Sequence, residues 1–111
     1  MHNVITLRRL AIADDKAAEL ADVFRLLGDG SRLRIVVACL HAAVPVSSLA
    51  EQLDLSVSLV SHHLRLLKAA RIVRSERRGK QVFYRAADHH IRRIITDMVE
   101  HLGETGAHEE E

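Results

Sequence analysis

The fold is decided by residues 47–67, SSLAEQLDLSVSLVSHHLRLL. Ser47 caps a short predicted helix over Ser48–Leu53, and residues 54–56 form a turn. A longer helix follows with Ser56 as its N-cap, because apolar side chains recur every three or four residues on one face. That inner face comprises Leu59, Val60, His63, Leu64 and Leu67. Two helices joined by a tight turn, the second one longer, predict a helix-turn-helix.

The spacing of apolar side chains changes after Ala70. Residues 72–77 (IVRSER) are compatible with a strand, residues 78–80 (RGK) supply a turn, and residues 81–85 (QVFYR) form the returning strand. A β-hairpin directly after a helix-turn-helix is typical of a winged helix. The predicted fold class is therefore mainly α with a small β-hairpin.

Two helices are predicted before this motif. The first covers residues 14–27, where Asp14 or Asp15 can act as the N-cap and apolar side chains share one face. The second begins after Ser31, as its cap, and reaches about His41. Both helices end before residues that favour turns.

A last helix opens at Asp88 and runs to about Leu102, and Gly103 and Gly106 are expected to end the ordered chain. Its apolar side chains form a wide stripe: Ile91, Ile94, Ile95, Met98, Val99 and Leu102. The stripe packs either on its own domain or on a second chain as a dimer seam. We expect a homodimer joined through terminal helices.

The composition fits one small globular domain. The chain has 111 residues, with 48% hydrophobic and 28% charged residues, so residues 1–104 are assigned to a single domain and residues 105–111 to a mobile acidic tail. Aromatic residues make up only 3%, so aliphatic side chains must build the core. A core this small favours oligomerisation.

The single cysteine, Cys39, excludes an intrachain disulfide and a cysteine-rich metal site, and its place on an apolar helix face predicts a buried structural thiol. The longest stretch without a charged residue, 35–50, is too short to span a bilayer. Arg8 and Arg9 interrupt the apolar start of the chain, which argues against a signal peptide. We expect a soluble cytoplasmic protein with no membrane partner.

The charge is unevenly distributed although the net charge is only +1. Residues 65–80 include many basic residues but only one acidic residue, Glu76, and this excess of positive charge indicates an anionic partner. Together with the predicted winged helix, this pattern favours double-stranded DNA. The start of the second motif helix would read base edges, through Val57, Ser58, Ser61 and His62. Phosphate contacts are expected from Arg65 and Lys68, and from Arg77, Arg78 and Lys80 at the hairpin tip.

The last helix carries a second set of polar side chains. Asp88 and His90 lie at its start, and His101 and Glu104 share a face near its end. His90 and His101 are eleven residues apart, about 16 Å at about 1.5 Å per residue, so one straight helix cannot bring both to one metal ion. Two copies of the helix running antiparallel across a two-fold axis can do so, giving two equal sites. The alternative interpretation is that these polar side chains bind no metal and only interact favourably with the helix dipole at the two ends of the helix.

Two imidazoles and two carboxylates suit tetrahedral Zn(II). Co(II) would mimic zinc in such a site, whereas Ni(II) would favour additional nitrogen donors.

The sequence resembles the ArsR/SmtB family of metal-sensing bacterial repressors from about Ala18 to Glu104. The resemblance rests on residues 26–29 (LLGD), 31–35 (SRLRI), 49–51 (LAE), 58–64 (SLVSHHL), Gly79 and 88–91 (DHHI). The last helix is most similar to the family's zinc-sensing branch, which implies that Asp88, His90, His101 and Glu104 form an inter-subunit site. Residues 44–47 (VPVS) lack the cysteines of the family's other metal site, so a thiolate-type sensor is not expected.

The resemblance implies a homodimeric repressor whose apo form binds operator DNA and releases it when zinc bridges the last helices. One alternative is a nickel or cobalt sensor that recruits donors such as His108 or His2. A zinc hydrolase is poorly supported, because four protein ligands leave no position for water. A protein-interaction module with incidental histidines is a third interpretation. We expect no enzymatic activity and no small-molecule substrate.

Overall fold

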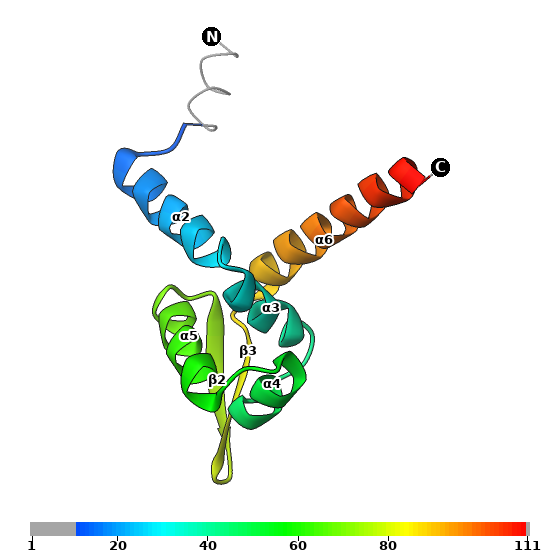
Figure 1. Ribbon diagram of the computed structural model, residues 1–111. Helices are drawn as coiled ribbons and strands as arrows, with labels where there is room; N and C mark the ends of the chain where they lie inside the picture. Colours follow the sequence, from blue (N-terminus) through cyan, green and yellow to red (C-terminus); the bar gives the residue numbers. More distant parts are fainter. Residues whose placement is uncertain (1–10, 111) are drawn as a thin grey trace.

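The computed structural model describes residues 11–110, and the side chains of residues 11–103. Its elements follow in chain order as α2 (Asp14–Leu27), α3 (Gly30–Ala38), β1 (Val44–Pro45), α4 (Val46–Leu53), α5 (Val57–Ala69), β2 (Val73–Arg78), β3 (Gln81–Ala86) and α6 (His89–Glu110). Figure 1 shows α3, α4, α5 and the sheet forming one body, from which α2 and α6 diverge at one end while the β2–β3 hairpin projects at the other. The predicted winged helix-turn-helix is confirmed.

The centre of the core is the inner face of α5. Val60, His63, Leu64 and Leu67 are buried there, as predicted. Leu59 was expected on the same face but is 40% exposed, because it lies about a quarter turn from the centre of the buried stripe at about 100° per residue. The other elements contribute Ile35, Val36, Cys39, Leu40, Leu49, Ala50, Ile72, Val73, Ala86 and Ile95. These contacts fix which face of α5 points outward.

Cys39 is the C-cap of α3 and is completely buried in the apolar core. Burial raises the pKa of its thiol to about 11, so the thiol stays protonated at neutral pH. The prediction of a buried cysteine is confirmed.

The caps of the two motif helices differ from each other. Ser56 caps α5 as predicted, and its Oγ accepts a hydrogen bond from the backbone N–H of Leu59 at 3.1 Å. The cap predicted at Ser47 is wrong, because α4 begins at Val46 after Pro45 and has no side-chain cap. Pairing of β1 with β3 extends the chain up to Pro45, so Ser47 already lies in the first helical turn.

The caps of the two preceding helices also differ from expectation. α3 begins after Asp29 instead of Ser31, and the Oδ2 atom of Asp29 accepts a hydrogen bond from the backbone N–H of Arg32 at 3.0 Å. The N-cap of α2 is Ala13, which has no side-chain acceptor. Asp14 and Asp15 instead occupy the first turn, where their charge favours the positive end of the helix dipole.

The sheet has three antiparallel strands in the order β1-β3-β2. The strand β1 was not predicted, because two residues are too few to show an alternating pattern; Val44 pairs with Tyr84. The β2–β3 hairpin closes at the pair Arg78 and Gln81, so its turn is Gly79-Lys80. Gly79 has a φ of +63°, which glycine adopts without steric cost. Both hairpin strands end one residue later than predicted.

The last helix also extends further than expected. The backbone of α6 continues to Glu110, so the end predicted near Leu102 is wrong. A single glycine costs a helix only about 1 kcal/mol and does not stop it, and a Cβ atom at Gly103 would meet no atom of the described residues within 4 Å. The mobility expected of residues 105–111 stays a prediction. Within residues 11–110, no helix is both long and apolar enough to cross a membrane.

The difference between the two serine caps can be measured. We expect Ser56→Ala to lower the free energy of unfolding by about 1 kcal/mol, because the N–H of Leu59 loses its acceptor. Ser47→Ala is the matched control and should change stability by only a few tenths of a kcal/mol, since Ser47 is exposed and caps nothing. Urea unfolding at one fixed protein concentration measures both; equal losses would contradict the assignment of the caps.

Candidate DNA-binding and metal-binding sites

The outer face of α5 carries the residues predicted to meet DNA. Val57 is 55% exposed, Ser58, His62, Arg65 and Lys68 are also exposed, and Ser61 is half-buried. The buried stripe on the opposite side of the helix holds this face outward. The structure therefore gathers all six of these predicted residues on one side of a single helix.

A hollow of about 480 Å³ lies between this face and the wing. It is lined by Ser61, Arg65, Lys68, Ala69 and Tyr84, and we call it the α5–wing hollow. Sequence reasoning did not single out Tyr84. Its position could have been inferred from alternation along β3, which places Tyr84 on the same face of the sheet as buried Ala86.

The two adjacent wing arginines point to opposite faces of the hairpin. Arg78 pairs with Glu76 at 3.1 Å, and its guanidinium lies 4.7 Å from the centre of the Phe83 ring. Arg85 also approaches Glu76, at 3.8 Å. Arg77 alternates onto the other face, where Tyr84 lines the α5–wing hollow. Glu76 therefore pairs with Arg78 and Arg85 on the outer face of the wing, whereas among residues 11–103 Arg77 forms no ion pair.

The neighbouring histidines of α5 have different environments. His62 is exposed on the outer face, whereas His63 is buried and its Nδ1 atom has no hydrogen-bond partner among the described residues. Burial lowers the pKa of His63, an effect that the nearby carboxylate of Asp29 partly opposes. Of the pair, only His62 is placed to meet a ligand.

The start of α6 brings Asp88 and the next two histidines together. Asp88 Oδ1 accepts a hydrogen bond from the backbone N–H of Ile91 at 3.0 Å, so Asp88 caps the start of α6, where the sequence predicts that the last helix opens. This hydrogen bond lowers the pKa of Asp88, so its carboxylate is ionised at neutral pH. The rings of His89 and His90 lie against each other, with centroids 3.9 Å apart.

The other two predicted donors lie far along the same helix. His101 is exposed and belongs to α6, eleven residues after His90. The side chain of Glu104 lies outside the described residues, as do those of His2 and His108. Within the part of the chain that is described, no three His, Cys, Asp or Glu side chains are grouped closely enough to hold a metal ion. One chain alone therefore does not assemble a site from its described donors.

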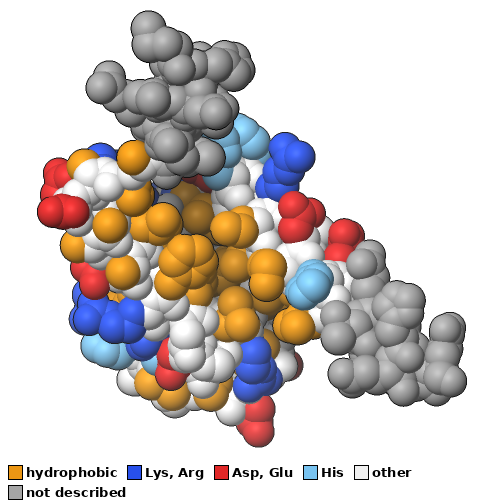
Figure 2. Space-filling model, turned by 90° about the horizontal axis from the view of Figure 1, so that it is seen from above, with side chains coloured by type: hydrophobic (Ala, Val, Ile, Leu, Met, Phe, Trp, Pro, Cys, Tyr) orange, Lys and Arg blue, Asp and Glu red, His pale blue; other side chains and the backbone are white. Residues whose placement is uncertain are grey.

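An apolar groove of about 500 Å³ runs between α2 and α6, and we call it the α2–α6 groove. Its walls include Leu20, Phe24, Leu33, Ile94 and Met98. Phe24 is 54% exposed and Met98 52%, which is unusual for large apolar side chains in a small domain. Figure 2 shows the resulting hydrophobic surface as a continuous orange area in the middle of the face from which α2 and α6 project.

Comparison with known proteins agrees with this geometry. Residues 29–75 match the bacterial regulatory proteins of the arsR family. A transcriptional repressor SmtB homolog from Synechocystis is 37% identical over 91 residues, which cover 82% of this chain and 69% of that protein. The chain belongs to the ArsR/SmtB family. The regulator KmtR of Mycobacterium tuberculosis is 36% identical over 95 residues, covering 83% of this chain and 73% of KmtR.

A solved structure extends the similarity to three dimensions. The winged helix-turn-helix DNA-binding domain Mb0332 from Mycobacterium bovis, described as homodimeric, superposes with a TM-score of 0.78 at 26% identity. The match covers 88% of this chain and 94% of that domain. Membership of the ArsR/SmtB family, inferred from sequence motifs, is thus confirmed, and the family comprises metal-responsive transcriptional repressors with a DNA-binding fold.

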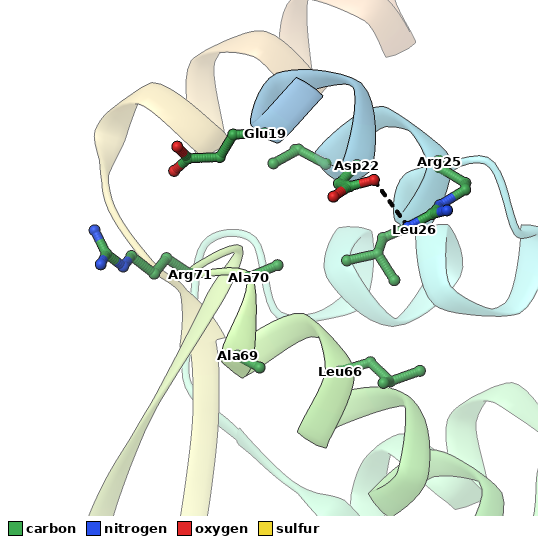
Figure 3. Close-up of a pocket in the computed structure, with 9 residues that line it drawn as sticks. Glu19, Asp22, Arg25, Leu26, Leu66, Ala69, Ala70 and Arg71 are labelled. Carbon is green, nitrogen blue, oxygen red and sulfur yellow. Dashed lines mark ion pairs between the residues drawn. The ribbon is translucent and has the colours of Figure 1, made fainter. Parts of the chain in front are cut away.

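The ArsR/SmtB fold leaves a further hollow between α2 and the end of α5. Figure 3 shows Glu19, Asp22 and Arg25 of α2 on one side of it, with Leu66 and Arg71 on the other. Asp22 and Arg25 pair with each other at 2.9 Å. Charges of both signs therefore line this hollow, and α2 contributes no fully buried residue to the core.

The two wing arginines provide a test of how the domain docks on DNA. Arg77→Ala should weaken binding and reduce the slope of log affinity against log salt by about 1, because a free cation on the DNA side is lost. Arg78→Ala should change the slope less, since the guanidinium of Arg78 is already paired with Glu76. Fluorescence anisotropy with a duplex selected from a random-sequence pool measures both variants.

The control variant is Glu76→Gln, which releases Arg78 and Arg85 and should strengthen binding. Equal losses from the two arginine variants would show that both faces of the hairpin meet DNA.

Proposed function

We propose that this chain is a homodimeric repressor whose apo form binds operator DNA and which releases the DNA when Zn(II) bridges the two α6 helices. The observation that carries the proposal is the separation of donors along α6. Asp88 and His90 lie at one end and His101 and Glu104 further along, so only a second, antiparallel helix completes a set of four.

The α2–α6 groove supports the dimer. Its walls are almost entirely apolar and open to solvent in the single chain, and α6 carries further exposed apolar residues in Val99 and Leu102. Burying such a surface against a second copy is favourable by roughly 25 cal/mol per Å² of apolar area. The homodimeric relative Mb0332 supports the same assembly.

The arrangement of α5 and the wing supports DNA as the partner. In a two-fold dimer each copy presents one α5 outer face and one wing, so the pair suits two half-sites in neighbouring major grooves. Val57, Ser58, Ser61 and His62 would contact base edges. Phosphates would be met by Arg65, Lys68, Arg77 and Lys80, with a smaller contribution from Arg78. Such a repressor acts where bacterial DNA is, in the cytoplasm.

The chemistry of the donors favours zinc. Asp88 is held ionised by the N–H of Ile91, and exposed imidazoles supply nitrogen donors. Zn(II) accepts such a mixed oxygen and nitrogen set in tetrahedral geometry. Thiolate chemistry is disfavoured, because Cys39 is buried with a raised pKa and residues 44–47 contain no cysteine. Four protein donors also leave no open position for a catalytic water, which argues for a regulatory role.

The proposed coupling follows from linkage. If zinc favours a dimer in which the two α5 helices are poorly spaced for DNA, zinc must weaken DNA binding, and DNA must weaken zinc binding by the same factor. A coupling free energy of about 1–3 kcal/mol corresponds to a change of about 5- to 150-fold.

Mixed dimers test whether the site is shared. One partner carries Asp88→Ala with His90→Ala, and the other carries His101→Ala with Glu104→Ala. In the mixed dimer one site loses all four donors and the other keeps all four, so one tight zinc ion should bind. Each parent homodimer has only half-sites and should bind zinc weakly. Competition with a chromogenic chelator measures this; equally weak binding by all three dimers would contradict a shared site.

Operator release tests the regulatory role. Apo protein is first used to select a duplex from a random-sequence pool, and its affinity is then measured with and without zinc, cobalt and nickel. Zinc should weaken the complex of the wild-type protein by the factor that linkage gives and leave the Asp88→Ala, His90→Ala variant bound. Release by nickel but not zinc would support the alternative sensor, and no release by any metal would contradict the proposal.

A further inference from the structure

The α5–wing hollow combines groups that suit a phosphate. Arg65 and Lys68 bring two cations from α5, and Tyr84 faces them from the central strand of the sheet. Ser61 adds a second hydroxyl one turn before Arg65. Cations and hydroxyl donors together are the groups that proteins direct at DNA phosphates.

None of the described residues that line the hollow is acidic, so none of them cancels these charges. The nearest acid of the wing in sequence, Glu76, alternates onto the opposite face of the hairpin and is engaged there by Arg78 and Arg85. Within residues 11–103, neither Arg65 nor Lys68 forms an ion pair. The positive potential of the hollow is therefore available to an external anion.

Tyr84 is held in place before any ligand arrives. Its backbone pairs with Val44 of β1 on one side and with Ser75 of β2 on the other, and its half-buried ring packs against the core. The side chain of Tyr84 makes no hydrogen bond to any described residue. A rigid ring with an uncommitted hydroxyl loses little conformational freedom when it binds.

We propose that the α5–wing hollow seats one backbone phosphodiester of the bound DNA, with the Tyr84 hydroxyl donating a hydrogen bond to a phosphate oxygen that Arg65 and Lys68 neutralise. This inference rests on the proposed DNA-binding function and adds Tyr84 to its contacts. One phosphate is then contacted by α5 and by the wing at the same time. These two contacts fix the depth and the angle of α5 in the major groove of the DNA.

The hydroxyl and the cations leave different signatures. Tyr84→Phe removes a neutral donor, so affinity should fall about tenfold while the salt slope stays unchanged. Arg65→Ala should lower the slope by about 1 in addition to weakening binding. Phosphates carry no sequence information, so Tyr84→Phe should weaken specific and non-specific duplexes by the same factor. The matched control is Ser75→Ala, which removes a hydroxyl from the neighbouring strand that does not line the hollow.

The decisive experiment combines these variants with neutral phosphates in the DNA. A duplex selected by the wild-type apo protein is remade with a methylphosphonate at one backbone position at a time. At one position in each half-site the substitution should weaken the wild type about tenfold more than it weakens Tyr84→Phe. Circular dichroism and thermal unfolding confirm that the variants fold.

The outcomes separate this inference from the proposed function. One outcome is that the wild type selects a duplex that Tyr84→Phe binds equally tightly and with the same dependence on methylphosphonate position. In that case the proposed phosphate contact of Tyr84 is wrong, and the proposal that the protein is a repressor stands. If the wild type selects no duplex, the proposed function fails first. A loss of affinity equal to that of Ser75→Ala would also overturn the role of Tyr84, because it would reflect the sheet and not the hollow.

Discussion

The packing of the inner face of α5 against α3, α4 and the sheet is the interaction on which the rest of the structure depends. Val60, Leu64 and Leu67 are almost completely buried, and each such side chain contributes about 1.5–3 kcal/mol when removed from water. Because the same helix carries the DNA-facing residues on its other side, core packing also sets their direction. The wing is positioned by the same core, through Val73 and Ala86.

Helical periodicity located the long helices, and the change of spacing after Ala70 together with the turn at residues 78–80 located the hairpin. Both signals depend on a pattern that is repeated along a whole element and not on one residue. The caps at Ser47 and Ser31 were wrong because a cap depends on the backbone angles of one residue, and these were set by the β1 pairing and by Asp29. The end of α6 was wrong for a related reason, since glycine lowers helix propensity but does not forbid a helix.

For the candidate sites, too, local features could be predicted from the sequence, whereas features that depend on tertiary contacts could not. Spacing along one helix is a local property, so the separation of His90 from His101 was visible in the sequence and the structure keeps it. The opposite orientations of Arg77 and Arg78, and the pairing of Glu76 with Arg78 and Arg85, depend on strand register and on side-chain contacts. Tyr84 was missed because its role depends on a hollow formed by two elements that are distant in sequence.

The open α2–α6 groove has a consequence for the life of the protein in a cell. In the proposed dimer, folding and assembly are one equilibrium, because α2 buries no residue completely until a second chain covers it. Single chains would then be the species most exposed to proteases, and the number of working repressors would rise with the square of the chain concentration when chains are scarce. Dilution during cell growth would thus lower repression more steeply than it lowers the concentration of the chain.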